Sequence, residues 1–171
     1  MAQTIKDLLK DVLAPAKRLA VLGIGSEFRG DDAAGILIAD NVDKMLLRRK
    51  KLPIKVFIGA TAPENLTGEI KRYRPSHILL ADSAEMRKRP GTIMYFTYDD
   101  VGEGMTFSTH KMPAKILADY FRKSLKCEVM MLGIQPKTIK FGMPVTAAVR
   151  DSAKEVAGAV IYAMTASKRR S

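Results

Sequence analysis

The chain has 171 residues, of which 47% are hydrophobic and 27% charged, a composition that fits one globular domain with a sizeable core. Its single cysteine excludes an intrachain disulfide and a cysteine cage for a metal, and no apolar stretch reaches the roughly 20 residues that span a bilayer. The formal net charge of +11 favours acidic partners, but the basic residues fall in separate short runs with few aromatic residues between them, so nucleic-acid binding is not indicated.

The first element in chain order is amphipathic. Apolar residues recur at helical spacing from Ile5 to Val12, and Pro15 ends the pattern, so residues 1–17 are expected to form a helical N-terminal extension. The segment lacks the apolar core of a secretion signal, which favours a cytoplasmic location and no membrane insertion. The continuous apolar run 19–25, which ends in glycines, is typical of a strand buried on both faces and therefore predicts a parallel sheet.

Helices and strands then alternate. Further strands are expected at 54–58, 77–81, 92–98 and 128–134, and helices from Ala33 to about Leu47, from Pro63, from Lys111 to about Leu125 and from Val145 to about Ala166, before a basic tail at 168–171. The run 92–98 follows only a short connection, which favours an antiparallel or edge strand. This order predicts an α/β protein: one domain spanning 1–171, a three-layer α/β/α sandwich around a mostly parallel five-stranded sheet.

The loop after the first strand combines glycines with two carboxylates. It departs from the G-x-G-x-x-G dinucleotide pattern because Phe28 stands at the third glycine position, where it would obstruct the approach of the helix. A P-loop would need Lys and Ser or Thr where the chain has Asp31 and Asp32. Two carboxylates repel a phosphate and suit a cation. Because one aspartate is enough to cap the next helix, we assign Asp31 to capping and Asp32 to function.

Two further residues are candidates for the carboxyl edge of the sheet, where sites form in such folds. Asp82 follows the apolar run 78–81, where a charge is costly unless compensated, although a turn aspartate is an equally good interpretation of this residue alone. His110 lies in a loop that leads into a helix, whereas His77 begins the third strand at the opposite edge. The two carboxylates of Asp32 and Asp82 and the His110 imidazole would form an incomplete shell for a divalent metal such as Ni or Zn.

Several motifs agree in order with one protein family. Residues 21–35 resemble the opening G-[IV]-G-N-x-x-x-x-D-[DE]-x-x-G signature of the endopeptidases that mature [NiFe]-hydrogenase large subunits. Further similar segments are Thr61-Ala62-Pro63-Glu64-Asn65, Leu80-Ala81-Asp82-Ser83-Ala84, Ser108-Thr109-His110-Lys111-Met112-Pro113 and Gly133-Ile134-Gln135-Pro136. These versions resemble the branch that serves hydrogenase 3-type enzymes. Two positions depart from the family: Ser26 replaces a common asparagine, and Ile58 stands where many members have an acid, whose role therefore does not carry over.

The resemblance implies both a fold and an activity. The fold would be an α/β/α sandwich of the phosphorylase/hydrolase-like type, and the activity that of an aspartic-type endopeptidase. Such an enzyme removes the C-terminal extension of a [NiFe]-hydrogenase large-subunit precursor after nickel insertion. Family metal-binding positions map onto Asp32, Asp82 and His110, which are therefore the expected catalytic and metal-contacting residues. The nickel would belong to the precursor, and no permanently bound cofactor is expected.

Two other functions stay open at this point. The chain resembles, more broadly, α/β/α peptidases that act on other proteins, and only substrate profiling separates those from a hydrogenase-processing enzyme. From a different class, a basic non-catalytic module would bind nucleic acid or an acidic assembly partner. Strongly salt-dependent binding to DNA or RNA, unaffected by changes at Asp32, Asp82 and His110, would favour such a module.

Overall fold

A computed structural model describes residues 3–49, 51–100, 106–107 and 113–170. The strands are β1 (Leu19–Ile24), β2 (Ile54–Ala60), β3 (His77–Glu85), β4 (Ile93–Phe96), β5 (Thr106–Phe107) and β6 (Glu128–Ile134). The α-helices are α1 (Ile5–Val12), α2 (Ala34–Leu46), α3 (Thr67–Tyr73), α4 (Ala114–Leu125) and α5 (Ala147–Arg170). Three short 3-10 helices are η1 (Gly30–Ala33), η2 (Pro63–Leu66) and η3 (Tyr98–Asp100).

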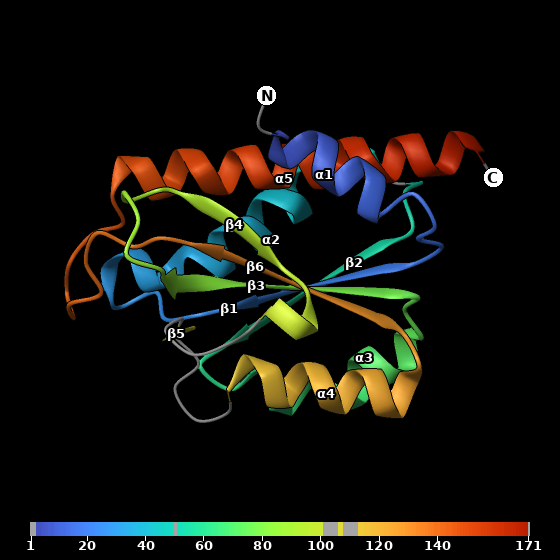
Figure 1. Cartoon of the computed structure of the whole chain (residues 1–171), viewed down its shortest axis with the longest axis horizontal. Helices are drawn as coiled ribbons and strands as arrows, with labels where there is room; N and C mark the ends of the chain where they lie inside the picture. Colours follow the sequence, from blue (N-terminus) through green and yellow to red (C-terminus); the bar gives the residue numbers. More distant parts are fainter. Residues whose placement is uncertain (1–2, 50, 101–105, 108–112, 171) are drawn as a thin grey trace.

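The sheet lies between two layers of helices, with α1, α2 and α5 on one face and α3 and α4 on the other (Figure 1). Its main path runs in the order β2-β1-β3-β6-β4, and β5 pairs with β3 beside that path. Strands β2, β1, β3 and β6 are parallel, whereas β4 is an antiparallel edge strand beside β6. The predicted α/β/α architecture around a mostly parallel five-stranded sheet is therefore confirmed.

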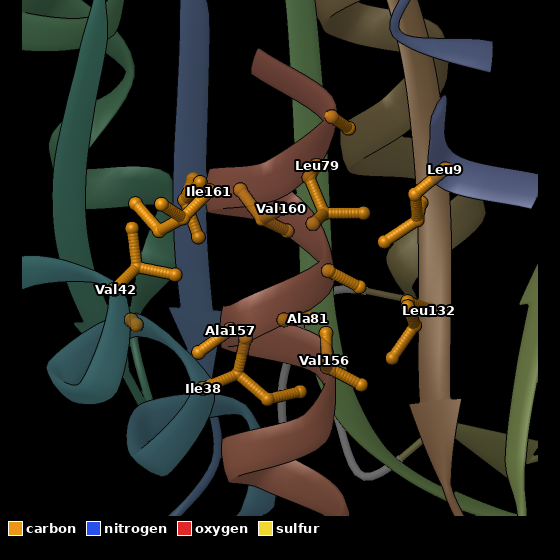
Figure 2. Packing of buried hydrophobic residues seen from close by; sticks show 14 of the residues in the cluster. Leu9, Ile38, Val42, Leu79, Ala81, Leu132, Val156, Ala157, Val160 and Ile161 are labelled. Atoms are coloured by element: carbon orange, nitrogen blue, oxygen red, sulfur yellow. The ribbon is translucent and has the colours of Figure 1, made fainter. Parts of the chain in front are cut away.

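The central strands are apolar throughout because helices cover both of their faces. Successive residues of β1 alternate between the two cores: Val21 packs in the cluster under α1, α2 and α5, and Leu22 in the cluster under α3 and α4. Figure 2 shows the first cluster, in which α5 lies across the middle of the sheet. Its labelled side chains are Leu9, Ile38, Val42, Leu79, Ala81, Leu132, Val156, Ala157, Val160 and Ile161. The buried centre of the sheet holds the carboxyl ends of β1 and β3 in fixed positions.

Some element bounds differ from the prediction. Strand β3 continues to Glu85, so Asp82 lies within the strand and not after it, because Asp82 and Ser83 still pair with Gly133 and Ile134 of β6. Helix α5 runs to Arg170, so the basic residues from 168 form its last turn and not a separate tail. In the part of the chain that the structure describes, no helix has the length and apolar character needed to cross a membrane.

Candidate functional site

The turn after β1 places Asp32 under the carboxyl end of that strand. Gly25 adopts a φ of 137°, and a Cβ atom added to it would stand 1.8 Å from the Asp32 carbonyl oxygen. The same oxygen accepts a hydrogen bond from the Ser26 amide at 3.3 Å. Only glycine combines this dihedral angle with so close a backbone approach. The second glycine of the motif therefore has a structural role, which is to close the loop onto η1.

Helix α2 approaches the sheet just as closely. A Cβ atom added to Gly35 would stand 2.0 Å from the carbonyl oxygen of Ala81 and 2.4 Å from that of Ile24. The first turn of α2 is thus in direct contact with the backbone of β1 and β3. Since η1 leads directly into α2, this contact fixes the height of Asp32 over the sheet.

Asp31 does not cap its own helix, and that prediction was wrong. The N-cap position of η1 is Arg29, and no side chain caps it. The buried Asp31 carboxylate instead accepts hydrogen bonds from the Lys137 amide at 2.8 Å and from the Thr146 amide at 2.7 Å, as well as from the Thr146 hydroxyl. Its charge is turned away from its own helix because two backbone donors and a hydroxyl converge on it from the loop before α5. Asp31 fastens that loop to η1.

We expect Asp31→Asn to lower the free energy of unfolding by about 2 kcal/mol. Each carboxylate oxygen receives a backbone N–H, Oδ2 from Lys137 and Oδ1 from Thr146, so an amide in either orientation sets its NH2 group against a buried donor. Urea denaturation measures the loss. Asp40→Asn is the matched control, because Asp40 forms only an exposed pair with Lys44 and its change is expected to stay within about 0.5 kcal/mol. Equal stability of Asp31→Asn and wild type would contradict the fastening role.

Asp32 and Asp82 meet at the carboxyl edge of the sheet through Ser83. The Ser83 hydroxyl donates to Asp32 Oδ1 at 3.0 Å, and the Ser83 amide donates to Asp82 Oδ1 at 2.8 Å. All three residues are buried, with exposed fractions of 0%, 1% and 1% for Asp32, Asp82 and Ser83. Buried carboxylates are kept only where hydrogen bonds compensate them. The structure therefore brings together two of the three predicted site residues, and it adds Ser83, for which the sequence indicated no role of its own.

Gln135 stabilises the end of β3 just beyond the two aspartates. Its side-chain oxygen accepts from the amides of Met86 at 2.7 Å and Lys88 at 3.2 Å, and its side-chain nitrogen donates to Glu85 Oε2 at 3.0 Å. With an exposed fraction of 4%, Gln135 is buried, and its hydrogen bonds hold the chain from Glu85 to Lys88 in place. The Gly-Ile-Gln-Pro motif thus has a structural role at the site, for which no local sequence pattern gave a reason.

The two histidines and the single cysteine were the other residues considered for chemistry. His110 lies outside the described residues, and within the described ranges no group of three or more His, Cys, Asp or Glu side chains is arranged to hold a metal ion. His77 begins β3, as predicted, at the end remote from Asp82, and burial lowers its pKa while Glu128 partly opposes the shift. Burial raises the pKa of the Cys127 thiol to about 11, so this cysteine is protonated at neutral pH and is a poor nucleophile.

Comparisons with known proteins agree on one family. A model of the hydrogenase maturation protease HycI matches residues 36–163. A putative hydrogenase maturation protease of Methanocaldococcus jannaschii is 34% identical over 161 residues, 92% of this chain and 94% of that protein. The hydrogenase 3 maturation protease of Escherichia coli K12 is 34% identical over 136 residues, 80% of this chain and 84% of that protein.

Solved structures agree with the fold. The crystal structure of a [NiFe] hydrogenase maturation protease HycI from Thermococcus kodakarensis superposes with a TM-score of 0.82 at 23% identity, covering 92% of this chain and 99% of that one. The solution structure of an endopeptidase HycI from E. coli gives 0.70 at 33% identity, covering 82% and 87%. With three quarters of the chain matched by the family model and two relatives 34% identical, the chain belongs to the hydrogenase maturation proteases, peptidases that process hydrogenases.

Proposed function

We propose that this protease removes the C-terminal extension of a [NiFe]-hydrogenase large-subunit precursor after nickel has been inserted. The observation that carries the proposal is the pair of buried aspartates, Asp32 and Asp82, joined through Ser83 at the carboxyl edge of the sheet in a chain of this family. Similarity to the E. coli hydrogenase 3 maturation protease supports a substrate of the hydrogenase 3 type.

In this proposal the nickel arrives with the substrate. Asp32, Asp82 and His110 supply two carboxylates and an imidazole, ligands that suit a nickel ion already held by the precursor's cysteines. A precursor without nickel lacks this anchor and binds weakly, so the enzyme discriminates by a difference in affinity. Because both carboxylates are buried in the free protein, a productive complex requires a local rearrangement on binding.

Hydrolysis needs a water molecule activated next to the scissile carbonyl. One route is the aspartic type, in which a carboxylate of Asp32 or Asp82 takes the proton of the attacking water. The other is activation of that water by the precursor's nickel. In both routes the proton taken from the attacking water passes to the amine that leaves with the C-terminal extension, and His110 is the proposed carrier of that proton.

The test compares two forms of one substrate. Purified protease is mixed with nickel-loaded and nickel-free large-subunit precursor, and C-terminal truncation is followed by mass spectrometry of the intact protein. We expect the loaded precursor to be shortened and the unloaded one to stay full length, because only the loaded form presents the ligand for the two aspartates. Equal cleavage of both forms would exclude nickel recognition, and absence of cleavage of either form would exclude the processing function itself.

A further inference from the structure

Four large apolar side chains project into solvent from two loops beside the candidate site. They are Phe28, Ile139, Phe141 and Met143, with exposed fractions of 68%, 41%, 80% and 47%, and they are called here the apolar rim patch. The rings of Phe28 and Phe141 are stacked with their centroids 6.4 Å apart. Single exposed apolar residues are normal on a protein surface, but four on two hydrogen-bonded loops, with two of their rings stacked, are characteristic of a binding surface.

The patch is held in place by hydrogen bonds between its two loops. The Gly142 amide donates to the Phe28 carbonyl at 2.8 Å, and Arg29 Nε donates to the Ile139 carbonyl at 3.2 Å. The Asp31 amide donates to the Thr138 carbonyl at 2.9 Å, in addition to the bonds that the Asp31 carboxylate accepts. A surface ordered in this way loses little conformational entropy when a partner binds.

The patch adjoins the candidate site through the chain itself. Its first loop continues directly into η1, which carries Asp32, and its second loop connects β6 to α5 on the same side of the molecule (Figure 1). A partner seated on the patch therefore lies next to the two aspartates. The two loops carry three basic side chains, Arg29, Lys137 and Lys140, against one exposed acidic side chain, Glu27, and no acidic side chain occurs between 137 and 146.

We infer that the apolar rim patch binds the folded part of the hydrogenase large-subunit precursor, close to the point where the C-terminal extension begins. This inference rests on the proposed function, and it identifies the surface of the protease that binds the substrate. The matching surface is apolar and bordered by acidic side chains, because Lys137 and Lys140 flank the patch. A second copy of this chain is a poor occupant, since an interface between two identical patches would bring together three basic side chains and only one acidic side chain, Glu27, from each copy.

The experiment uses the double variant Phe28→Ser/Phe141→Ser with a matched control. Leu47→Ser removes a side chain of similar exposure, 69%, at the other end of the 13-residue helix α2, about 20 Å away. Affinity for nickel-loaded precursor is measured by titration calorimetry, and KM and kcat for its cleavage are measured separately. Since aromatic anchors at the centre of an interface dominate its affinity, we expect the double variant to raise Kd and KM about tenfold or more with little change in kcat. Leu47→Ser is expected to match the wild type.

A second variant tests the charge argument and guards against misfolding. Lys140→Glu leaves the apolar side chains in place and is expected to weaken binding about fivefold at low salt, with the difference shrinking as salt is added. Wild-type Kd and KM in both variants would overturn the docking surface while leaving the proposed function intact. Patch variants that lose only self-association, with unchanged precursor affinity, would also overturn it. If the wild type neither bound nor cleaved the precursor, the proposed function would fail together with the inference.

Discussion

Asp32→Asn and Asp82→Asn are each expected to reduce precursor cleavage by about a hundredfold or more, the usual cost of losing a group that takes part in proton transfer. An amide is nearly the same shape as a carboxylate, but it does not accept a proton from water and it carries no negative charge to bind nickel. We expect both variants to fold, because asparagine has the size of aspartate and the bonds from the Ser83 hydroxyl at position 32 and the Ser83 amide at position 82 can go to an amide oxygen as they do to a carboxylate. Single-turnover cleavage of nickel-loaded precursor, followed by mass spectrometry, measures the loss.

Asp31→Asn provides the contrast for these two variants. Asp31 is as buried as Asp32 and stands next to it, but its hydrogen bonds hold the loop before α5. Its replacement is therefore expected to lower the free energy of unfolding while the molecules that remain folded cleave the precursor at nearly the wild-type rate. His110→Ala should resemble the two site variants, as the third proposed contact to nickel. Full activity in Asp32→Asn, Asp82→Asn and His110→Ala would eliminate the site assignment.

Gly35→Ala is expected to destabilise the protein by about 3 kcal/mol, near the upper end of the usual cost of overpacking. The added methyl group would meet two backbone oxygens, those of Ala81 and Ile24, and neither can rotate away as a side chain would. Helix α2 must then move off the sheet and carry η1 and Asp32 with it. Guanidinium denaturation measures the stability, and cleavage at a temperature where the variant is folded shows the effect on the site.

Gly158→Ala is the matched control for this substitution. Gly158 also lies within a helix, α5, but a Cβ atom added to it meets nothing within 4 Å. Removing the backbone freedom of an unneeded helical glycine is expected to stabilise the protein by about 0.5–1 kcal/mol. Opposite signs for the two glycines would show that close packing, and not helix propensity, determines the cost at Gly35. A stable Gly35→Ala variant would contradict the close approach of α2.

The sheet was predictable because each central strand is a continuous apolar run, and the edge position of β4 followed from its short connection. The end of β3 was not predictable from the sequence. Asp82 and Ser83 are residue types that commonly end a strand, but here they still pair with β6, and the strand continues past them. Strand β5 has only two residues, too few to form a pattern. Local sequence describes a strand well only where the neighbouring strands do not determine its length.

The candidate site was also predictable only in the part that the local sequence determines. Its two aspartates were found because charges beside buried strands need a reason, and the family resemblance supplied one. The partners of Asp31 were not predictable, because they lie 106 and 115 positions further along the chain, and two of the donors are backbone amides, which carry no sequence signal. Ser83 and Gln135 lacked a role for a similar reason, since their bonds also join distant segments.

The bonds from Asp31 to Lys137 and Thr146 also have a consequence for the order in which the protein matures on the ribosome. The turn η1 and the loop before the last helix must meet before these bonds can form, and α5 packs with α1 and α2 on one face of the sheet. Contacts between such distant segments form late and slowly. A nascent chain in which α5 and the preceding loop have not yet left the exit tunnel therefore lacks these bonds, and η1 with Asp32 is held in place only after they have emerged.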